Sequence, residues 1–453
     1  DPEVRAWWRA KADEIYRLIP DFGGFLVKAH AEGQPGPQLY GRTHADGANL
    51  IADALAPHHG IVLWRTFVYS TVKEDRAKQA YDEFRPLDGK FRPNVILQVK
   101  NGPIDFQPRE PFHPLFGRMD RTNVAMEVQL TREYLGQASG IVFLAPMWSE
   151  ALAADTCSPS CGTPVRATIK AIAGVSNIGS DRNWTGNHFD QANWYAYGRL
   201  AWDPALPPRK IAEEWTRMTW GNQERVVRPI VAIMMRSREA MVDTMTPLGL
   251  AHQMATDHHY GPGPWVCDLA EPSWNPCYYS KADSNGIGFD RTASGSDAVA
   301  QYAPGLGSCF ADLKCVPDEY LLWFHHVPWT YRMRSGEDLW TALVTRYDRG
   351  IASFESALRQ WDGLSPFIDR QRHQEVRATL ERQRIEGKWW RDASIAYWQS
   401  LSKLELPEGH PPPGHPLSWY QSIHFDTVPG YLAPGTGHEY SCVPPRGGPP
   451  CAL

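Results

Sequence analysis

The segment Gly60-Ile-Val-Leu-Trp-Arg-Thr-Phe-Val-Tyr69 decides the fold of this chain. It is a nearly continuous apolar run, too short for a buried helix and rich in the β-branched and aromatic residues that favour strands. Similar runs recur in the first half of the chain, at residues 22–28, 94–100, 123–130 and 171–176. Helical patterns lie before and between them, at residues 1–20, 45–55 and 74–84. Apolar strands that alternate with helices predict a parallel β-sheet covered on both faces.

Polar residues stand at the C-terminal end of each predicted strand, which is the edge of a parallel sheet where functional residues gather. A (β/α)8 TIM barrel keeps its active site at that edge of the sheet. The predicted fold class is therefore α/β, a (β/α)8 TIM barrel of which this sequence holds the C-terminal five βα units. Five strands cannot close such a barrel, so we expect three more strands before residue 1. An open, doubly wound sheet is the alternative, although no Gly-x-Gly-x-x-Gly turn supports dinucleotide binding.

The sequence changes character after Pro204-Ala-Leu-Pro-Pro208. From there on, long helical patterns alternate with Pro- and Gly-rich loops, and we expect helices at residues 209–220, 224–245, 336–360 and 369–401. The chain of 453 residues is long enough for a barrel with an appendage. We therefore predict two parts, the barrel with the active site over residues 1–204 and a mainly α-helical C-terminal domain over residues 205–453.

Composition argues against a nucleic-acid-binding protein and against a membrane-spanning one, and it is compatible with a sugar-binding protein. The formal net charge is −5, whereas nucleic-acid-binding proteins usually carry a basic excess. The longest apolar stretch, residues 141–148, is too short to span a bilayer. Trp, with 19 residues, outnumbers both Phe and Tyr. Most of these rings should fill a core, but indoles also stack on sugar rings, and Trp274, in a loop beside Asn275, is the one we expect in a pocket.

The eight cysteines fall into near pairs along the chain: Cys157 and Cys161, Cys267 and Cys277, Cys309 and Cys315, Cys442 and Cys451. All lie in Pro-, Gly- or Ser-rich stretches. We expect local disulfides formed in an oxidising compartment, with free structural thiols as the alternative. No Cys-x-x-Cys motif occurs, and the side chains of the adjacent histidines 258 and 259 should diverge, so no metal site is predicted.

Six charged residues gather at the predicted strand ends: the cations Lys28, Arg65 and Lys100, and the carboxylates Glu32, Asp105 and Glu133. Two carboxylates suit the hydrolysis of a glycoside, where one protonates the leaving oxygen and another activates water. The cations suit an anionic substrate, so the combination suggests a sugar acid. A set of structural ion pairs along the rim is the alternative reading. Glu127, on the same strand face as Glu133, is a rival base that we interpret as a structural polar residue.

Several long motifs extend this interpretation. They are residues 22–37, Val62-Leu-Trp-Arg-Thr-Phe-Val-Tyr69, Gln98-Val-Lys-Asn-Gly-Pro-Ile-Asp-Phe106, Glu127-Val-Gln-Leu-Thr-Arg-Glu-Tyr-Leu-Gly136, Gly286-Ile-Gly-Phe-Asp-Arg-Thr292 and Phe324-His-His-Val-Pro-Trp329. With them the sequence resembles the α-glucuronidases of glycoside hydrolase family 67 over nearly its whole length. Two departures stand out. The β-sandwich domain and the first three barrel strands of that family are absent here, and Ser280 stands where a His is expected.

The resemblance implies an inverting α-glucuronidase that removes α-1,2-linked (4-O-methyl)-D-glucuronic acid from xylooligosaccharides in xylan degradation, without metal or cofactor. Glu32 stands at the position of the general acid, and Asp105 and Glu133 at those of the two carboxylates that activate water. Lys28, Arg65 and Lys100 stand where the family contacts the uronic acid. The resemblance also implies a homodimer formed through the C-terminal domain. We expect a secreted protein, with a periplasmic or cytoplasmic one as the alternative, and a non-catalytic carbohydrate-binding fragment is the alternative to an enzyme.

Overall fold

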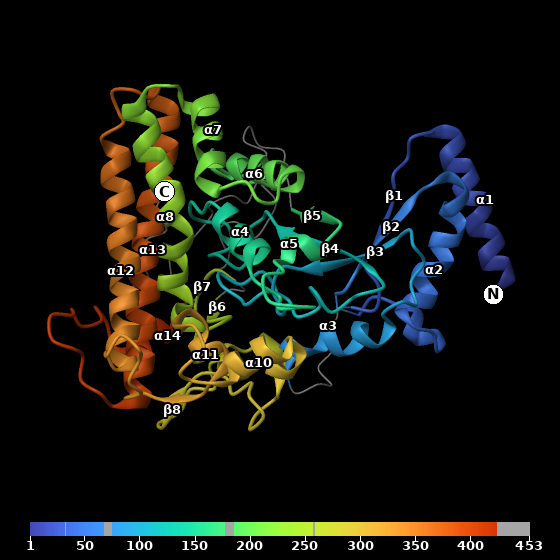
Figure 1. Ribbon diagram of the computed structural model, residues 1–453. Helices are drawn as coiled ribbons and strands as arrows, with labels where there is room; N and C mark the ends of the chain where they lie inside the picture. Colours follow the sequence, from blue (N-terminus) through green and yellow to red (C-terminus); the bar gives the residue numbers. More distant parts are fainter. Residues whose placement is uncertain (32, 68–74, 177–184, 257–258, 424–453) are drawn as a thin grey trace.

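The computed structural model describes residues 1–31, 33–67, 75–176, 185–256 and 259–423. Its central sheet has five parallel strands in the order β1-β2-β3-β4-β5 (Figure 1). Their bounds are β1 Gly24–Val27, β2 Ile61–Arg65, β3 Val95–Lys100, β4 Asn123–Gln129 and β5 Ala171–Val175. All five predicted strands are therefore present and the α/β class is confirmed. Closure into an eight-stranded barrel stays a prediction.

The register of the sheet places the C-terminal ends of β2 and β3 beside polar residues of the next strand. Arg65, the last residue of β2, pairs with Gln98 of β3, and Lys100, the last residue of β3, pairs with Glu127 of β4. Strands β3 and β4 are buried almost throughout, as both faces of a covered parallel sheet should be. Strand β1 at the sheet edge is more open, and its Leu26 is 50% exposed.

The first half of the chain contains α1 Pro2–Leu18, α2 His44–Leu55, α3 Arg76–Phe84, α4 Ala145–Ala153, α5 Val165–Thr168 and α6 Asp190–Trp202. The helices predicted near residues 1–20, 45–55 and 74–84 are confirmed, and three further helices, α4 to α6, are not among the predicted ones. Local capping explains where two of them begin. Thr43 and Asp46 form a capping box at the start of α2, each side chain accepting a backbone N–H from the other residue. Asp75 caps α3, because its Oδ1 accepts the N–H of Ala77 over 3.0 Å.

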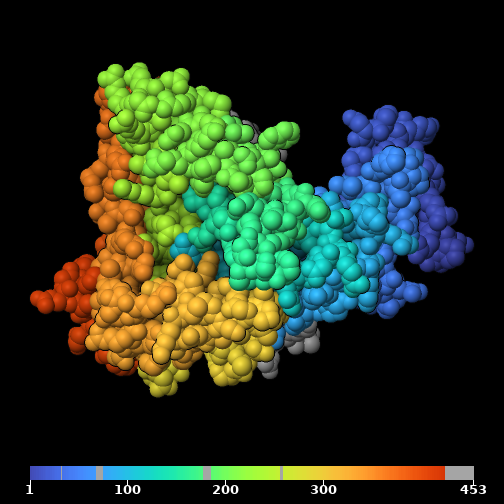
Figure 2. Space-filling view, in the orientation of Figure 1, coloured from blue at the N-terminus to red at the C-terminus, as the bar shows by residue number. Residues whose placement is uncertain are grey.

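The second half of the chain is dominated by long helices. These are α7 Pro208–Trp220, α8 Glu224–Met245, α12 Leu339–Asp362 and α13 Arg370–Ser402. The last three pack side by side as one bundle, and in Figure 2 α8 (green) and α12 (orange) lie on the opposite side of the molecule from α1 (blue). Gly350 of α12 allows close approach, since a Cβ there would lie 2.3 Å from Oγ1 of Thr244 on α8.

Shorter elements connect the bundle to the sheet. Two antiparallel pairs are β6 Met254–Thr256 with β7 Gly261–Pro262, and β8 Gly286–Ile287 with β9 Val327–Pro328. Between and after them lie α9 Pro276–Ser280, α10 Pro304–Ala311, α11 Leu321–Phe324 and α14 Leu417–Gln421. None of the described helices has both the length and the apolar character needed to cross a membrane.

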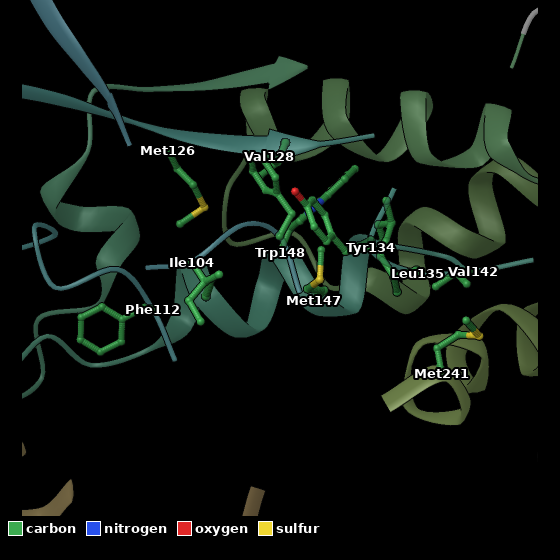
Figure 3. Packing of buried hydrophobic residues seen from close by; sticks show 14 of the residues in the cluster. Ile104, Phe112, Met126, Val128, Tyr134, Leu135, Val142, Met147, Trp148 and Met241 are labelled. Atoms are coloured by element: carbon green, nitrogen blue, oxygen red, sulfur yellow. The ribbon is translucent and has the colours of Figure 1, made fainter. Parts of the chain in front are cut away.

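One hydrophobic core joins the sheet to the bundle. Figure 3 shows Met126 and Val128 of β4, Met147 and Trp148 of α4, and Met241 of α8, which all belong to this one cluster of buried residues. The fully buried tryptophans include Trp148, Trp323, Trp361 and Trp398. Many of the abundant indoles therefore serve the core.

Three of the four expected disulfides are present in the structure: Cys157–Cys161, Cys267–Cys277 and Cys309–Cys315. Local pairing is confirmed for these six cysteines. Cys442 and Cys451 lie outside the described residues. The disulfides agree with an oxidising compartment.

A buried ion pair ties α3 to a distant part of the chain. Asp75 accepts hydrogen bonds from Nε of Arg291 over 2.9 Å and from the hydroxyl of Ser296 over 2.6 Å. Asp75 and Arg291 are 2% and 1% exposed. Burial alone would raise the pKa of Asp75, but the Arg291 guanidinium holds it below its usual range. The start of α3 is thereby fixed against the loop that follows β8.

Arg291→Met should lower the free energy of unfolding by about 3–5 kcal/mol at neutral pH, because Asp75 would remain as an unpaired buried charge. In the unaltered protein the lowered pKa of Asp75 stabilises the fold above the ordinary pKa of the carboxyl group, and this stabilisation is lost as the pH falls. In the variant burial raises that pKa, so the deficit should shrink in acid as Asp75 protonates. Urea unfolding at neutral pH and at about pH 4, near the unperturbed pKa, measures both effects.

Arg334→Met is the matched control, because the Arg334 side chain is 49% exposed and pairs with Asp318 at the surface. That change should cost less than about 1 kcal/mol. An equal loss in the two variants, or a deficit of Arg291→Met that grows in acid, would contradict the argument.

Candidate active site

Three cations stand at the C-terminal edge of the sheet and converge on one aromatic ring. Arg65 ends β2, Lys100 ends β3, and Lys28 directly follows β1. The centre of the Phe67 ring lies 4.3 Å from Nζ of Lys28, 5.0 Å from the guanidinium carbon of Arg65 and 3.9 Å from Nζ of Lys100. The negative face of an aromatic ring attracts cations. The structure thus brings together the three cations that the sequence analysis singles out.

Arg65 is held by a buried carboxylate. Its Nε donates to Oε2 of Glu127 over 2.8 Å and its Nη2 donates to Oε1, a bidentate pair. Gln98 donates to the same Oε2 over 2.7 Å. Both oxygens of Glu127 are occupied and its side chain is 1% exposed. Glu127 is therefore a structural partner of Arg65, as the sequence analysis interprets it, and a poor candidate for the base.

Asp105, on the loop after β3, is surrounded by two cations and a phenol. Lys100 Nζ contacts Oδ1, Arg76 Nη2 donates to Oδ2 over 3.0 Å, and the Tyr134 hydroxyl donates to Oδ2 over 2.5 Å. Burial by itself would raise the pKa of Asp105, but the charges of Lys100 and Arg76 hold it well below the usual range of a carboxyl group. Burial in turn lowers the pKa of Lys100. Asp105 is therefore ionised at any pH near neutrality.

Arg76 is a site residue that the sequence analysis missed. It is the first residue of α3, directly after the capping Asp75, and is 5% exposed. The Tyr279 hydroxyl accepts from Nη1 over 3.0 Å, and the Tyr278 hydroxyl accepts the Arg76 backbone N–H over 2.9 Å. Helix α9, which ends at Ser280, therefore holds Arg76 in place. The position of Arg76 after a residue type that favours the helix N-cap could be recognised in the sequence, but its contact with Asp105 could not, because that contact depends on long-range packing.

Glu133, on the loop after β4, is less enclosed than Asp105. Its carboxylate accepts from Nε2 of Gln129 over 3.0 Å and lies 3.1 Å from Nδ1 of His259, and its side chain is 32% exposed. Burial raises the pKa of Glu133 and the charge of Asp105 adds to this, but the contacts with His259 and Gln129 outweigh both and lower it. Glu133 is an ionised carboxylate with access to solvent.

An aromatic wall stands beside these two carboxylates. The His259 ring centre lies 4.3 Å from that of Tyr134 and 5.6 Å from that of His252. Burial lowers the pKa of His252, so this ring is neutral, and its Nε2 lies 3.2 Å from the carbonyl oxygen of Trp274. Trp274, the predicted pocket residue, thus reaches the wall through its backbone, and the residue as a whole is 47% exposed.

Left-handed backbone conformations, uncommon outside glycine, cluster around the same residues. Phe106 follows Asp105 with φ 52°, and Arg132 precedes Glu133 with φ 62°. His252 has φ 51° and His30, two residues beyond Lys28, has φ 58°. Such conformations concentrate at functional sites, where the surrounding structure must hold them.

Two further expectations concern the acid and metal binding. Glu32 lies outside the described residues, so its distance from Asp105 and Glu133 stays open.

Among the residues that the structure describes, the His, Cys, Asp and Glu side chains with metal-like spacing are Asp155, Cys157 and Cys161. Both cysteines are joined in a disulfide, so they offer no thiolate ligands.

Comparison with known proteins gives consistent matches along the chain. Residues 1–184 match the model of the glycosyl hydrolase family 67 middle domain, and residues 185–411 match that of the family 67 C-terminus. Alpha-glucuronidase A of Aspergillus tubingensis is 40% identical over 423 residues, which cover 89% of this chain and 50% of that protein. Alpha-glucuronidase of Hypocrea jecorina is 41% identical over 422 residues, which cover 89% and 49%.

The chain therefore spans about half the length of the curated relatives it matches. A solved GH138 enzyme targeting pectin rhamnogalacturonan II aligns with a TM-score of 0.46 and 12% identity, over 88% of this chain and 44% of that one, which carries no argument about fold or function. The two family models together cover residues 1–411 in unbroken order. The chain belongs to glycosyl hydrolase family 67.

Proposed function

We propose that this chain carries the catalytic centre of an inverting α-glucuronidase, which removes α-1,2-linked (4-O-methyl)-D-glucuronic acid from glucuronoxylan-derived oligosaccharides. The observation that carries the proposal is the group of three cations around the Phe67 ring, next to the ionised carboxylates Asp105 and Glu133. Cations and carboxylates at one edge suit a substrate with its own carboxylate and a glycosidic bond. The relatives named α-glucuronidase support the same substrate class.

The cations provide the recognition of the uronic acid. A carboxylate that enters a poorly hydrated site must find charged partners, and a hydrogen bond to a charged group is worth about 1.5–3 kcal/mol. Lys28, Arg65 and Lys100 converge from three neighbouring strands, so they can meet one anionic group above the sheet. A neutral sugar offers these cations no carboxylate, so it should be bound more weakly than a uronate.

The carboxylates divide the proton transfers. Glu32 serves as the general acid, by its position in the family motif, and protonates the leaving xylosyl oxygen. Glu133 accepts the proton from the attacking water, because its carboxylate is partly exposed and is less strongly tied than that of Asp105. Asp105, fixed by Lys100, Arg76 and Tyr134, orients the same water from the other side. The water then attacks the anomeric carbon opposite to the leaving group.

Further parts of the proposal concern the whole protein. We infer a catalytic barrel over residues 1–204 and a helical C-terminal domain over residues 205–453, through which two copies form a homodimer. Secretion is supported by the disulfides. Nucleic acid and membranes are not expected as partners, and no metal or other cofactor is assigned a role.

Proton NMR of the full chain with an aldouronic acid tests the function and its stereochemistry together. Glucuronic acid should be released, and its first-formed anomer should be β, because direct displacement by water inverts the α-linkage. The α-anomer appearing first would contradict inversion. Binding of the oligosaccharide without release would instead favour a non-catalytic carbohydrate-binding protein.

Glu133→Gln should lower kcat by about 100- to 10,000-fold, the usual contribution of a general base. The KM for the glucuronide should change much less, since the cations that bind it remain. Glu375→Gln is the matched control, because Glu375 also pairs with a histidine, His188, outside the site. Steady-state kinetics on one aldouronic acid compare the two variants, and equal activity of both would sink the assignment of Glu133.

Removing Arg65 together with its partner tests the recognition of the uronate. In Arg65→Met with Glu127→Gln no buried charge is left unpaired, and kcat/KM for the glucuronide should fall about ten- to 100-fold, the loss of one charged contact. The rate on a matching glucoside should not fall. Arg199→Met with Glu214→Gln is the control, another bidentate pair, between α6 and α7. If the preference for uronide over glucoside stays unchanged, these cations are structural ion pairs only.

A further inference from the structure

Glu110 is a buried carboxylate whose partners are backbone amides. Its Oε2 accepts the N–H of Ile104 over 2.6 Å, and its Oε1 accepts those of Asp105 over 3.0 Å and Gln107 over 2.8 Å. Glu110 is 8% exposed, and no ion pair joins it to a cation among the described residues. The Glu110 carboxylate therefore bridges three backbone amides of the loop that leads from β3 through Asp105.

This loop is also fixed from outside. A Cβ on Gly102 would lie 2.5 Å from Cβ of Glu110, so the beginning and the end of the loop pack in direct contact. The neighbouring Arg109 points the other way, where Glu150 of α4 accepts from its Nε over 3.1 Å and Glu239 of α8 accepts from its Nη2 over 2.5 Å. Residues 109 and 110 thus anchor the loop on both sides.

We propose that Glu110 is a positioning residue for Asp105, which sets the orientation of that carboxylate toward Arg76, Lys100 and Tyr134. This inference rests on the proposed function, in which Asp105 orients the attacking water. Phe106, the residue after Asp105, has a left-handed backbone, and the N–H groups on both sides of it, of Asp105 and Gln107, bind the same oxygen of Glu110. Glu110 thus holds the backbone on both sides of that left-handed residue.

The consequence for Asp105 follows from what surrounds it. The charged and titratable groups that face Asp105 or act on it are Lys100, Arg76, Tyr134, Glu133, Glu110 and His252. Lys100 and Arg76 keep the pKa of Asp105 low against the effect of burial. If the loop shifts, these contacts lengthen, burial dominates and the pKa of Asp105 rises. The acid limb of the kcat profile should then move to higher pH.

Glu110→Gln is the informative change, because the side chain keeps its shape. The amide keeps one oxygen acceptor, but an NH2 group takes the place of the other oxygen. This NH2 group faces a backbone N–H from which it cannot accept a hydrogen bond. A misplacement of about 1 Å at a catalytic group can cost about 100-fold, so kcat should fall by about that factor with KM little changed. Asp392→Asn is the control for general destabilisation, since Asp392 is another buried carboxylate that accepts a backbone N–H, that of Gly414, and that also pairs with Arg391 and Lys388.

Amide hydrogen exchange over residues 101–110 gives a readout that does not need activity. Exchange at Ile104, Asp105 and Gln107 should be faster in Glu110→Gln and unchanged in Asp392→Asn. Unchanged exchange, or faster exchange with the kcat and pH profile of the unaltered protein, would overturn the proposal. A kcat loss that the control shares would also overturn it, as general destabilisation. If the unaltered protein releases no glucuronic acid, the proposed function fails, and faster exchange still supports the hold of Glu110 on the loop.

Discussion

The buried ion pair between Asp75 and Arg291 is the constraint on which the site depends. Two charges this deep in a protein are tolerable only together, since each alone would carry a large desolvation cost. Their pairing forces the start of α3 against a segment more than 200 residues away in sequence. Arg76, the next residue, is carried with it and reaches Asp105 over 3.0 Å. The buried pair thus places Arg76, whose charge helps to keep the Asp105 carboxylate ionised.

The site works as one balanced arrangement of charges. Lys100 pairs with Asp105, and Arg65 pairs with Glu127, while the Phe67 ring lies beneath the cations without neutralising them. Each carboxylate lowers the cost of a buried cation, so removal of one member exposes its partner to the full effect of burial. Asp105 and Glu133 then differ by environment, one bound to two cations and a phenol, the other partly exposed beside a histidine. Two carboxylates in unlike surroundings suit two different tasks.

Much of this architecture could be predicted from local sequence, because the relevant signals are periodic. Apolar runs at strand spacing identify β1 to β5, and charged residues at their ends identify Lys28, Arg65 and Lys100. Arg76, Tyr134 and His259 could not be found this way, since their roles arise from long-range packing that periodicity does not encode. The pairing of Arg65 with Glu127 depends on the register between β2, β3 and β4, which no single strand reveals.

The helical second half of the chain belongs to the scaffold of the site. On α13, Glu386 accepts hydrogen bonds from the hydroxyls of Ser139 and Tyr260, both over 2.7 Å. Ser139 lies on the loop that carries Glu133, and Tyr260 follows His259. The partly buried side chain of Glu386 therefore connects both partners of the Glu133–His259 contact to the bundle. Gln383, one turn earlier, binds the N–H and the carbonyl of Ile141. A boundary near residue 204 can therefore separate two parts of the sequence without separating the site from its support.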